Sequence, residues 1–272
     1  MTIGECLKHG SNMIGQRDTM LLLCHITEKT SAYVMLNEDV RLEEAEKAKF
    51  LSYVNRCKQG EPLQYIISQW DFMGQTLRTD NRALIPRPET ELLVEEALKF
   101  LQHREFAGQP IKVLDLCTGS GCIAVAVAKA GDYCVTAADI SQDTLSLAKE
   151  NGLGLDINFV QSDLFSEIEG IFDAIISNPP YITSKEMANL SSTVLNYEPH
   201  LALRGGDDGM DIYRKLIPQS LKFLKPGGAL FLEIGPAAVK NIMTDAGFED
   251  VCLKNDYAGL PRIVYGKKEG EL

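Results

Sequence analysis

The tetrapeptide Asn178-Pro179-Pro180-Tyr181 follows directly after the apolar run 174–177. Its two prolines lack a backbone N–H and stiffen the turn, which leaves carbonyl oxygens as acceptors. Asn178 adds a side-chain carbonyl and Tyr181 adds an aromatic face. Such a turn offers acceptors to an NH₂ group and a flat surface to a planar group. The alternative is that the tetrapeptide has only a structural role, as a rigid Pro-Pro turn beside an asparagine that serves as a cap.

An amide-type nitrogen is the substrate that this arrangement favours. The lone pair of such a nitrogen is delocalised, and no side chain deprotonates it cheaply. Two acceptors that hold both N–H hydrogens would aim the lone pair at an incoming methyl group. They would also gain strength as positive charge develops on the nitrogen. The tetrapeptide is therefore predicted to form the catalytic and substrate-binding site of a nitrogen methyltransferase.

A second candidate site is a glycine-bearing turn between an apolar strand and a helix. Glycine lets the backbone pass close to a ligand at φ values that are closed to other residues, and the following helix offers free N–H groups. Asp139 ends the next strand, where a carboxylate can accept hydrogen bonds from both hydroxyls of a ribose. The residues of the turn are Asp115, Leu116, Cys117, Thr118, Gly119, Ser120 and Gly121.

This pattern fits either a nicotinamide dinucleotide or S-adenosyl-L-methionine, and two features favour the second ligand. Asp115 would face the cationic amino-acid end of the methyl donor, whereas it would repel a pyrophosphate. Asp163 and Leu164 follow the third strand, where the carboxylate can accept a hydrogen bond from the adenine amine and the leucine can cover a ring face. An aspartate at a strand end is also a common helix cap.

From residue 111 onward, apolar strands alternate with helical segments such as 123–130 and 144–150. This alternation predicts an α/β fold with a mostly parallel, doubly wound sheet, in which both candidate sites lie at the carboxyl ends of strands. The last two strands are close together along the chain, which predicts a hairpin at one sheet edge. The predicted strands are 112–115, 133–138, 157–160, 174–177, 229–234, 251–254 and 263–265.

The N-terminal part has helical spacing instead, as in 42–57, and Asp18 is predicted to cap a helix that includes 20–24. The runs 64–67 and 76–79 around Gly74 predict a β-hairpin. Pro86-Arg87-Pro88 leads into a helix over 89–101. We expect three parts: a helical substrate-recognition domain at 1–62, a β-hairpin linker at 63–85, and a methyltransferase domain at 86–272.

The composition is that of a soluble globular protein, with 45% hydrophobic and 24% charged residues. No apolar run approaches membrane-spanning length and the first residues lack a signal-peptide stretch, so we expect a cytoplasmic protein without membrane partners. The net charge of −11, without a Lys/Arg block, argues against stable nucleic-acid binding. None of the seven cysteines forms a C-x-x-C pair, so we expect free, buried thiols and no metal site.

The Asp-x-x-x-Gly-x-Gly turn, the acidic strand end and Asn-Pro-Pro-Tyr together resemble methyltransferases of exocyclic or amide nitrogens. Further segments resemble one family of that class, the bacterial-type release factor glutamine methyltransferases. The resemblance covers residue 60 to the C-terminus. The N-terminal part resembles the family in its helical character more than in any motif. These segments are 62–67, 84–91, Tyr197-Glu198-Pro199, Ala202-Leu203, 206–209 and 224–228.

The resemblance implies a Rossmann-like class I methyltransferase sheet that binds S-adenosyl-L-methionine. It also implies methyl transfer to the side-chain amide nitrogen (N5) of the glutamine in the Gly-Gly-Gln motif of class 1 peptide chain release factors, which modulates translation termination. By position, Cys117–Gly121, Asp139, Asp163 and Leu164 would bind the donor, and Asn178 would lie near it. We expect a monomer.

Two segments leave their roles open. Cys117 stands where the family often has glycine, and because cysteine disfavours positive φ, we expect a slightly reshaped loop. The segment Pro86-Arg87-Pro88-Glu89-Thr90-Glu91 either closes over the donor, contacts the partner, or merely starts a helix.

Three other functions stay open at this stage. A methyltransferase of a DNA adenine or ribosomal RNA guanine would share the donor site and the tetrapeptide, but it must capture an unstacked base, and the chain has no long insertion for this. A nicotinamide oxidoreductase leaves the tetrapeptide unexplained. A non-catalytic binding protein that grips a partner with its helical domain would not need the intact tetrapeptide.

Overall fold

The computed structural model describes residues 1–103 and 110–270. The chain forms two compact units. The smaller contains Met1–Gln69 together with Ser191–Tyr197, and the larger contains Trp70–Leu190 and the chain from Glu198 onward. The sequence prediction placed all of 86–272 in one domain, so the assignment of Ser191–Tyr197 to the smaller unit is a correction. A reading along the chain cannot show that a short excursion belongs to a distant segment.

The smaller unit is helical, as predicted. Its core contains the fully buried Leu22, Leu23 and Phe50. A capping box between Thr2 and Glu5 begins its first helix. Asp18 lies in the first turn of α2 and does not cap it, because the chain turns at Gly15 with φ 87°. The helices are α1 (Ile3–Ile14), α2 (Gln16–Thr27), α3 (Ser31–Leu36), α4 (Glu44–Lys58), α5 (Leu63–Ile67) and α10 (Ser192–Tyr197).

The run 64–67 was predicted as a strand, and this is wrong. It belongs to the short helix α5, with Pro62 at the cap position. Leu63, Tyr65 and Ile66 are buried there, so packing overrides the strand preference of aromatic and β-branched side chains. The two-stranded sheet around Gly74 consists of β1 (Gln69–Phe72) and β2 (Gln75–Arg78). Met73 and Gly74 both have positive φ, as a type I′ hairpin turn requires.

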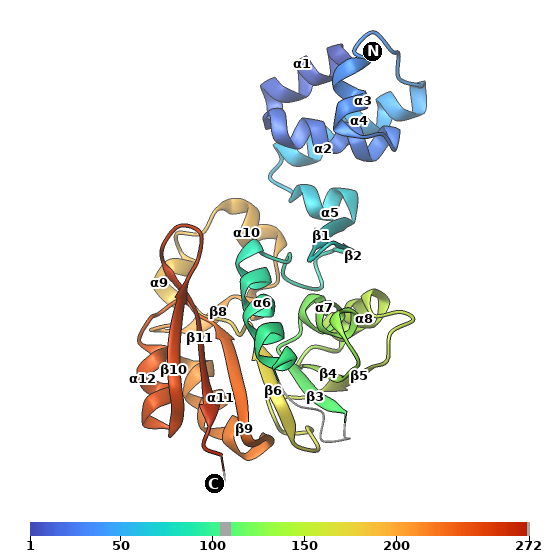
Figure 1. Cartoon of the computed structure of the whole chain (residues 1–272). Helices are drawn as coiled ribbons and strands as arrows, with labels where there is room; N and C mark the ends of the chain where they lie inside the picture. Colours follow the sequence, from blue (N-terminus) through green and yellow to red (C-terminus); the bar gives the residue numbers. More distant parts are fainter. Residues whose placement is uncertain (104–109, 271–272) are drawn as a thin grey trace. The chain divides into compact units, whose positions relative to one another are not determined.

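The larger unit contains a seven-stranded sheet in the order β10-β11-β9-β6-β3-β4-β5 (Figure 1). Strands β9, β6, β3, β4 and β5 run parallel to one another, whereas β11 pairs antiparallel with both β9 and β10. The predicted α/β sheet with an edge hairpin is confirmed. The strands are β3 (Ile111–Leu116), β4 (Tyr133–Asp139), β5 (Ile157–Gln161), β6 (Phe172–Ser177), β9 (Leu224–Glu233), β10 (Phe248–Asn255) and β11 (Pro261–Lys268).

Helices cover both faces of this sheet, because successive strand residues point to opposite sides. Val113 and Ile176 pack into one core, with α6 (Pro88–Gln102) and α7 (Cys122–Ala130). Leu114 and Ile175 pack into the other, with α11 (Asp211–Phe223) and α12 (Val239–Asp245). Helix α8 (Gln142–Asn151) connects β4 to β5. The remaining elements are β7 (Ile182–Thr183), α9 (Ser184–Met187), η1 (His200–Ala202) and β8 (Arg204–Gly206).

The order of the strands places a switch point in the middle of the sheet. From β3 the chain continues through β4 to β5 on one side, and then returns to β6 on the other side of β3. Ligands of open parallel sheets bind at the carboxyl ends of the strands at such a point. The glycine turn follows β3 and Asn178 follows β6, so both candidate sites meet there.

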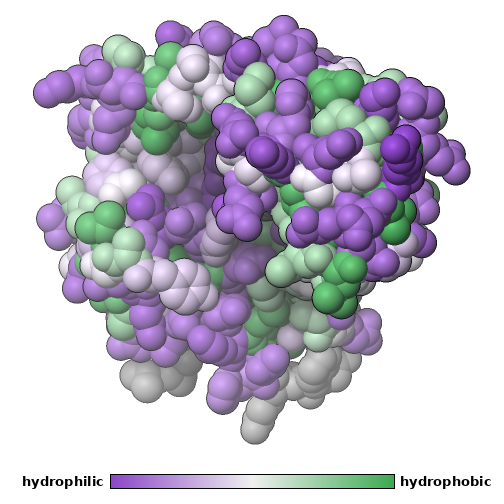
Figure 2. Space-filling view, turned by 90° about the horizontal axis from the view of Figure 1, so that it is seen from above, coloured by the Kyte–Doolittle hydropathy of each residue, from purple (hydrophilic) through white to green (hydrophobic). Residues whose placement is uncertain are grey.

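The face of the molecule drawn in Figure 2 is mostly polar. In the view of Figure 2, hydrophilic residues cover most of the visible face and hydrophobic residues form small, interrupted groups. None of the helices in 1–103 and 110–270 is both long and apolar enough to cross a membrane. All seven cysteines are free; Cys6 and Cys122 are buried, but Cys134 and Cys252 are exposed, which corrects the expectation of buried thiols throughout.

Candidate active site

A cavity of about 450 Å³ opens at the carboxyl ends of β3, β4, β5 and β6, within the larger unit. This volume suits a small-molecule ligand. Four residues predicted from the sequence are not among those that line it: Asp115, Gly121, Pro179 and Tyr181. The predicted residues that do line it are Cys117, Thr118, Gly119, Ser120, Asp139, Asp163, Leu164, Asn178 and Pro180.

Two residues of the wall have a left-handed backbone without being glycine. Cys117 has φ 61° and Leu164 has φ 50°, a conformation that costs roughly 1–2 kcal/mol for a residue with a Cβ. Such strain gathers at functional sites. Cys117 therefore takes up the left-handed backbone that a glycine would adopt. Burial raises the pKa of its thiol to about 12, so the side chain is neutral.

Asp115 holds the glycine turn from behind. Its side chain is fully buried, and its Oδ2 accepts hydrogen bonds from Thr118 Oγ1 (2.5 Å) and from the backbone N–H of Ala124 (3.0 Å) in α7. Its Oδ1 has no hydrogen-bond partner among the described residues. Burial raises the pKa of Asp115 to about 7, although both hydrogen bonds oppose this. A negative charge at this position is therefore poorly compensated by the protein alone.

Asp139 is the acidic residue at the end of β4 that lines the cavity. Its Oδ2 accepts from the backbone N–H of Gly119 and its Oδ1 from that of Ser141, both at 3.0 Å. Burial raises the pKa of Asp139, and these backbone donors partly oppose the rise. Because each carboxylate oxygen can accept more than one hydrogen bond, both oxygens retain capacity for a ligand.

Asp163 and Leu164 form the next part of the wall. Asp163 is exposed, and Ser162 Oγ donates to the carbonyl of Leu164 at 2.7 Å. Both residues of this short loop line the same cavity.

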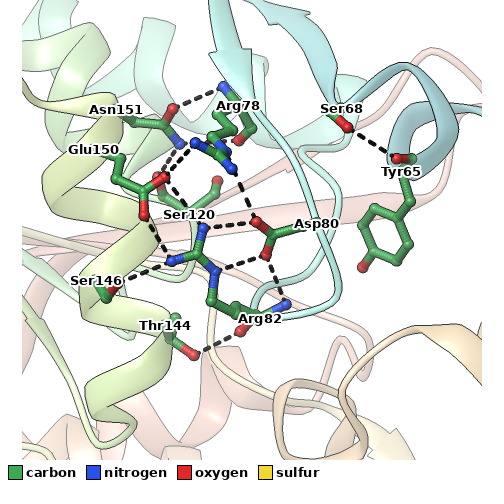
Figure 3. A network of polar contacts seen from close by, with 10 residues as sticks. All are labelled: Tyr65, Ser68, Arg78, Asp80, Arg82, Ser120, Thr144, Ser146, Glu150 and Asn151. Atoms are coloured by element: carbon green, nitrogen blue, oxygen red, sulfur yellow. Dashed lines mark hydrogen bonds and ion pairs between the residues drawn. The ribbon is translucent and has the colours of Figure 1, made fainter.

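The segment 81–87, which connects the hairpin to α6, forms another part of the wall. Figure 3 shows how Arg82 ties this segment to α8: its guanidinium bonds Asp80, Ser146 and Glu150. Thr144 Oγ1 donates to the carbonyl of Arg82 at 2.7 Å. The segment is thereby fixed to α8.

Arg87 and Pro88 confirm one of the roles that the sequence left open, the start of a helix. Pro88 is the first residue of α6, and Arg87 occupies the N-cap position without a side-chain capping hydrogen bond. Arg87 also lines the cavity. The Arg87 guanidinium bonds both carboxylate oxygens of the buried Glu198, at 2.7 and 2.8 Å. Two motifs that are 111 residues apart are thus joined at the cavity by a charged pair.

Asn178 follows β6, and its side chain is the first member of a series of hydrogen bonds that continues through two buried residues. Its Nδ2 donates to Thr90 Oγ1 at 3.1 Å, and Thr90 Oγ1 in turn donates to Glu233 Oε2 at 2.6 Å. Thr90 and Glu233 are only 2% and 1% exposed. Burial raises the pKa of Glu233, whereas the bond from Thr90 and the charge of Arg262 oppose the rise.

Tyr181, the last residue of the tetrapeptide, packs against glycines. A Cβ on Gly235 would lie 2.7 Å from the Tyr181 ring, and one on Gly205 would lie 2.5 Å from its Cα. The hydroxyl of Tyr181 donates to Glu233 Oε1 at 3.3 Å. Burial, followed by the charge of Glu233, raises the pKa of Tyr181 to about 12. The tyrosine is therefore a neutral support for the turn.

Sequence reasoning missed Glu233, Arg82 and the role of Thr90. Glu233 carried a usable signal, because it is an ionisable residue inside the otherwise apolar strand predicted at 229–234. The pairing of Arg82 with α8 is a contact between distant segments that no local pattern marks.

Two family models match the chain. A methyltransferase small domain matches residues 90–206, and a PrmC N-terminal domain matches residues 5–67. Among solved structures, a methyltransferase from Pyrococcus furiosus aligns with a TM-score of 0.54 at 19% identity, over 84% of this chain and 100% of that one. The catalytic domain of hMettl16 aligns with a TM-score of 0.60 at 13% identity, over 92% and 94%. At such identities these structures establish the fold alone.

Curated relatives are much more similar in sequence. The release factor glutamine methyltransferase of Clostridium acetobutylicum is 35% identical over 97% of this chain and 95% of its own length. That of Koribacter versatilis is 40% identical over 91% and 89%, and that of Streptococcus pneumoniae 45% over 74% and 71%. With this similarity along nearly the whole chain, the protein belongs to the release factor glutamine methyltransferase family.

Proposed function

We propose that this enzyme transfers a methyl group from S-adenosyl-L-methionine to the side-chain amide nitrogen (N5) of the glutamine in the Gly-Gly-Gln motif of class 1 release factors. The observation that carries this proposal is the position of Asn178. It lies at the end of β6, on the wall of the cavity that the glycine turn also lines.

The cavity suits a cationic donor. Its wall or its immediate support contains the carboxylates of Asp115, Asp139 and Asp163. Arginines also line the cavity, and two of them, Arg82 and Arg87, are paired with glutamates. Asp115 Oδ1 has no partner among the described residues. A sulfonium with an ammonium group would offset this negative charge, whereas the pyrophosphate of a dinucleotide would add to it. When bound, S-adenosylmethionine supplies an electrophilic methyl group.

The donor-binding roles that we propose follow from which residues line the cavity. Asp139 would accept the ribose hydroxyls with its remaining lone pairs, and Asp163 with Leu164 would hold the adenine. Cys117–Gly121 would pass along the amino-acid part. Asp115 would act from behind the turn through its charge, because it does not line the cavity.

The glutamine amide would be held by acceptors. The side-chain carbonyl of Asn178 and a backbone carbonyl of the Pro179-Pro180 turn would accept its two N–H hydrogens, beside the supported face of Tyr181. This grip aims the nitrogen lone pair at the methyl carbon, and alignment supplies most of the acceleration. The nitrogen would take the methyl group as the sulfur–methyl bond of the donor breaks and leaves a neutral thioether. It would then release one proton to solvent, so no general base is needed.

The partner is a release factor in this proposal, and the helical unit with α10 is proposed to recognise it. We propose that the enzyme acts as a cytoplasmic monomer and does not bind nucleic acid stably.

A competition assay tests the proposal. Radiolabelled methyl transfer is measured with intact release factor, deproteinised ribosomal RNA and DNA offered at equal concentration. Incorporation into the release factor alone supports the proposal, whereas preferential incorporation into either nucleic acid contradicts it.

A further inference from the structure

The side-chain amide of Asn178 can hold a substrate NH₂ group in only one of its two orientations. Its carbonyl oxygen must face the substrate, because the Asn178 NH₂ is a donor and would repel the substrate's N–H hydrogens. An asparagine at the edge of a cavity has no intrinsic preference for either orientation. Something in the protein must therefore select one.

The hydroxyl of Thr90 makes this selection. A hydroxyl has a single proton to donate, and Thr90 gives it to Glu233 Oε2 at 2.6 Å. Its oxygen can then only accept, so the group of Asn178 that lies 3.1 Å away must be the NH₂. The Asn178 carbonyl oxygen is turned away from Thr90 as a result.

Glu233 sets the donor-to-acceptor direction of this series of hydrogen bonds, because a carboxylate only accepts. Its two oxygens receive two different hydroxyls, from Thr90 and from Tyr181. The guanidinium of Arg262 lies beyond, 3.4 Å from the hydroxyl of Tyr181, and is held by Asp256. These donors and the positive charge favour the ionised carboxylate, and they oppose the burial that raises the pKa of Glu233.

We infer that Thr90 and Glu233 are positioning residues for methyl transfer: together they fix the amide of Asn178 so that its carbonyl oxygen faces the acceptor nitrogen. The three residues come from the start of α6, the end of β6 and the end of β9, so the fold itself assembles the chain of hydrogen bonds. This inference rests on the proposed methylation of an amide nitrogen, but the orientation of Asn178 is a property of the protein alone.

Single-turnover methylation of the release factor by two Thr90 variants tests the rate effect. Thr90→Val removes the hydroxyl and keeps the shape, so we expect the transfer rate to fall about tenfold, as the loss of one net hydrogen bond allows, with donor affinity within twofold of the unmodified enzyme. Thr90→Ser should restore most of the rate. Ser220→Ala, which removes another buried hydroxyl in the larger unit, is the matched control and should leave the rate unchanged.

Glu233→Gln offers one carbonyl oxygen to two hydroxyls. The other carboxylate oxygen is replaced by an NH₂ group, which cannot accept. When this NH₂ faces Thr90, the Thr90 hydroxyl donates to Asn178 Oδ1 instead and reverses the side-chain amide of Asn178. We therefore expect the transfer rate to fall at least as much as in Thr90→Val. An unmodified rate in either Thr90→Val or Glu233→Gln would overturn the role of that residue.

A double-mutant cycle with Asn178→Ala separates positioning from general structural damage. Thr90→Val should cost about tenfold in the natural background and nothing further in the Asn178→Ala background, because no amide remains to be oriented. An equal cost in both backgrounds would overturn the inference.

The NH₂ signals of Asn178 in the ligand-free protein provide a readout that does not depend on activity. We expect these signals, assigned by their loss in Asn178→Ala, to exchange slowly with solvent and to exchange at least tenfold faster in Thr90→Val. Unchanged exchange would show that the NH₂ does not face Thr90. If exchange responds while no release factor is methylated, the proposed function fails and the oriented amide stands.

Discussion

The buried carboxylate of Asp115 makes a quantitative prediction about the substitution Asp115→Asn. A pKa near 7 in place of the ordinary 3.8 means that ionising this group in the folded protein costs ~4 kcal/mol more than in the unfolded chain, at ~1.4 kcal/mol per tenfold change in the ionisation constant. Between these two pKa values the folded protein keeps the proton and the unfolded chain does not. The contribution of Asp115 to stability therefore falls as the pH rises from about 4 to about 7.

The amide that Asp115→Asn introduces would carry no charge and would escape this penalty. Its carbonyl oxygen can accept from Thr118 and Ala124 as Oδ2 does. Its NH₂ would replace Oδ1, which has no partner among the described residues, at a cost of roughly 1–3 kcal/mol. The stability of Asp115→Asn relative to the natural protein should thus increase by about 3 kcal/mol between pH 5 and pH 8.

Urea unfolding of both proteins at pH 5 and pH 8, without ligand, measures this difference, and Asp163→Asn on the cavity wall controls for the loss of a negative charge. Calorimetry at pH 7 in two buffers should also show proton release when the natural protein binds the cationic donor, because the donor favours the ionised form of Asp115. The variant should bind more weakly and release no proton. A stability difference that does not change with pH would refute the reasoning.

Three further substitutions test the site. Asn178→Ala should slow methyl transfer by about a hundredfold or more, as loss of a key transition-state contact does, while donor affinity measured by calorimetry falls far less; equal losses would give Asn178 a donor-binding role instead. Asp139→Ala should chiefly weaken donor binding, by about tenfold or more, since two hydroxyl contacts would be lost, and unchanged affinity in the same titration would refute its ribose role. Gly235→Ala places a Cβ 2.7 Å from the Tyr181 ring and should lower kcat by displacing the ring, so an unchanged kcat would show that this packing does not support catalysis.

The sequence predicted the sheet and the ends of its strands because both follow from local patterns. Apolar runs marked every strand of the large sheet, and the glycine turn and Asn178 each follow such a run directly. The parallel arrangement then brings these strand ends to one edge. That much of the candidate site needed no knowledge of contacts between distant segments.

What the sequence did not predict depends on packing. The helix α5 forms where strand-favouring residues are buried by their neighbours. Asp115 supports the turn from behind because its Oδ2 meets the N-terminus of α7. The pair Arg87 and Glu198 and the chain from Thr90 to Glu233 join residues more than 100 positions apart, and nothing in their local sequence marks the partner.

Mass spectrometry of purified release factor after incubation with this enzyme and S-adenosylmethionine tests the central claim most directly. We predict one added methyl group on the glutamine of the Gly-Gly-Gln motif, and none on a release factor in which that glutamine is replaced. An unmethylated release factor, in the presence of bound donor, would contradict the account.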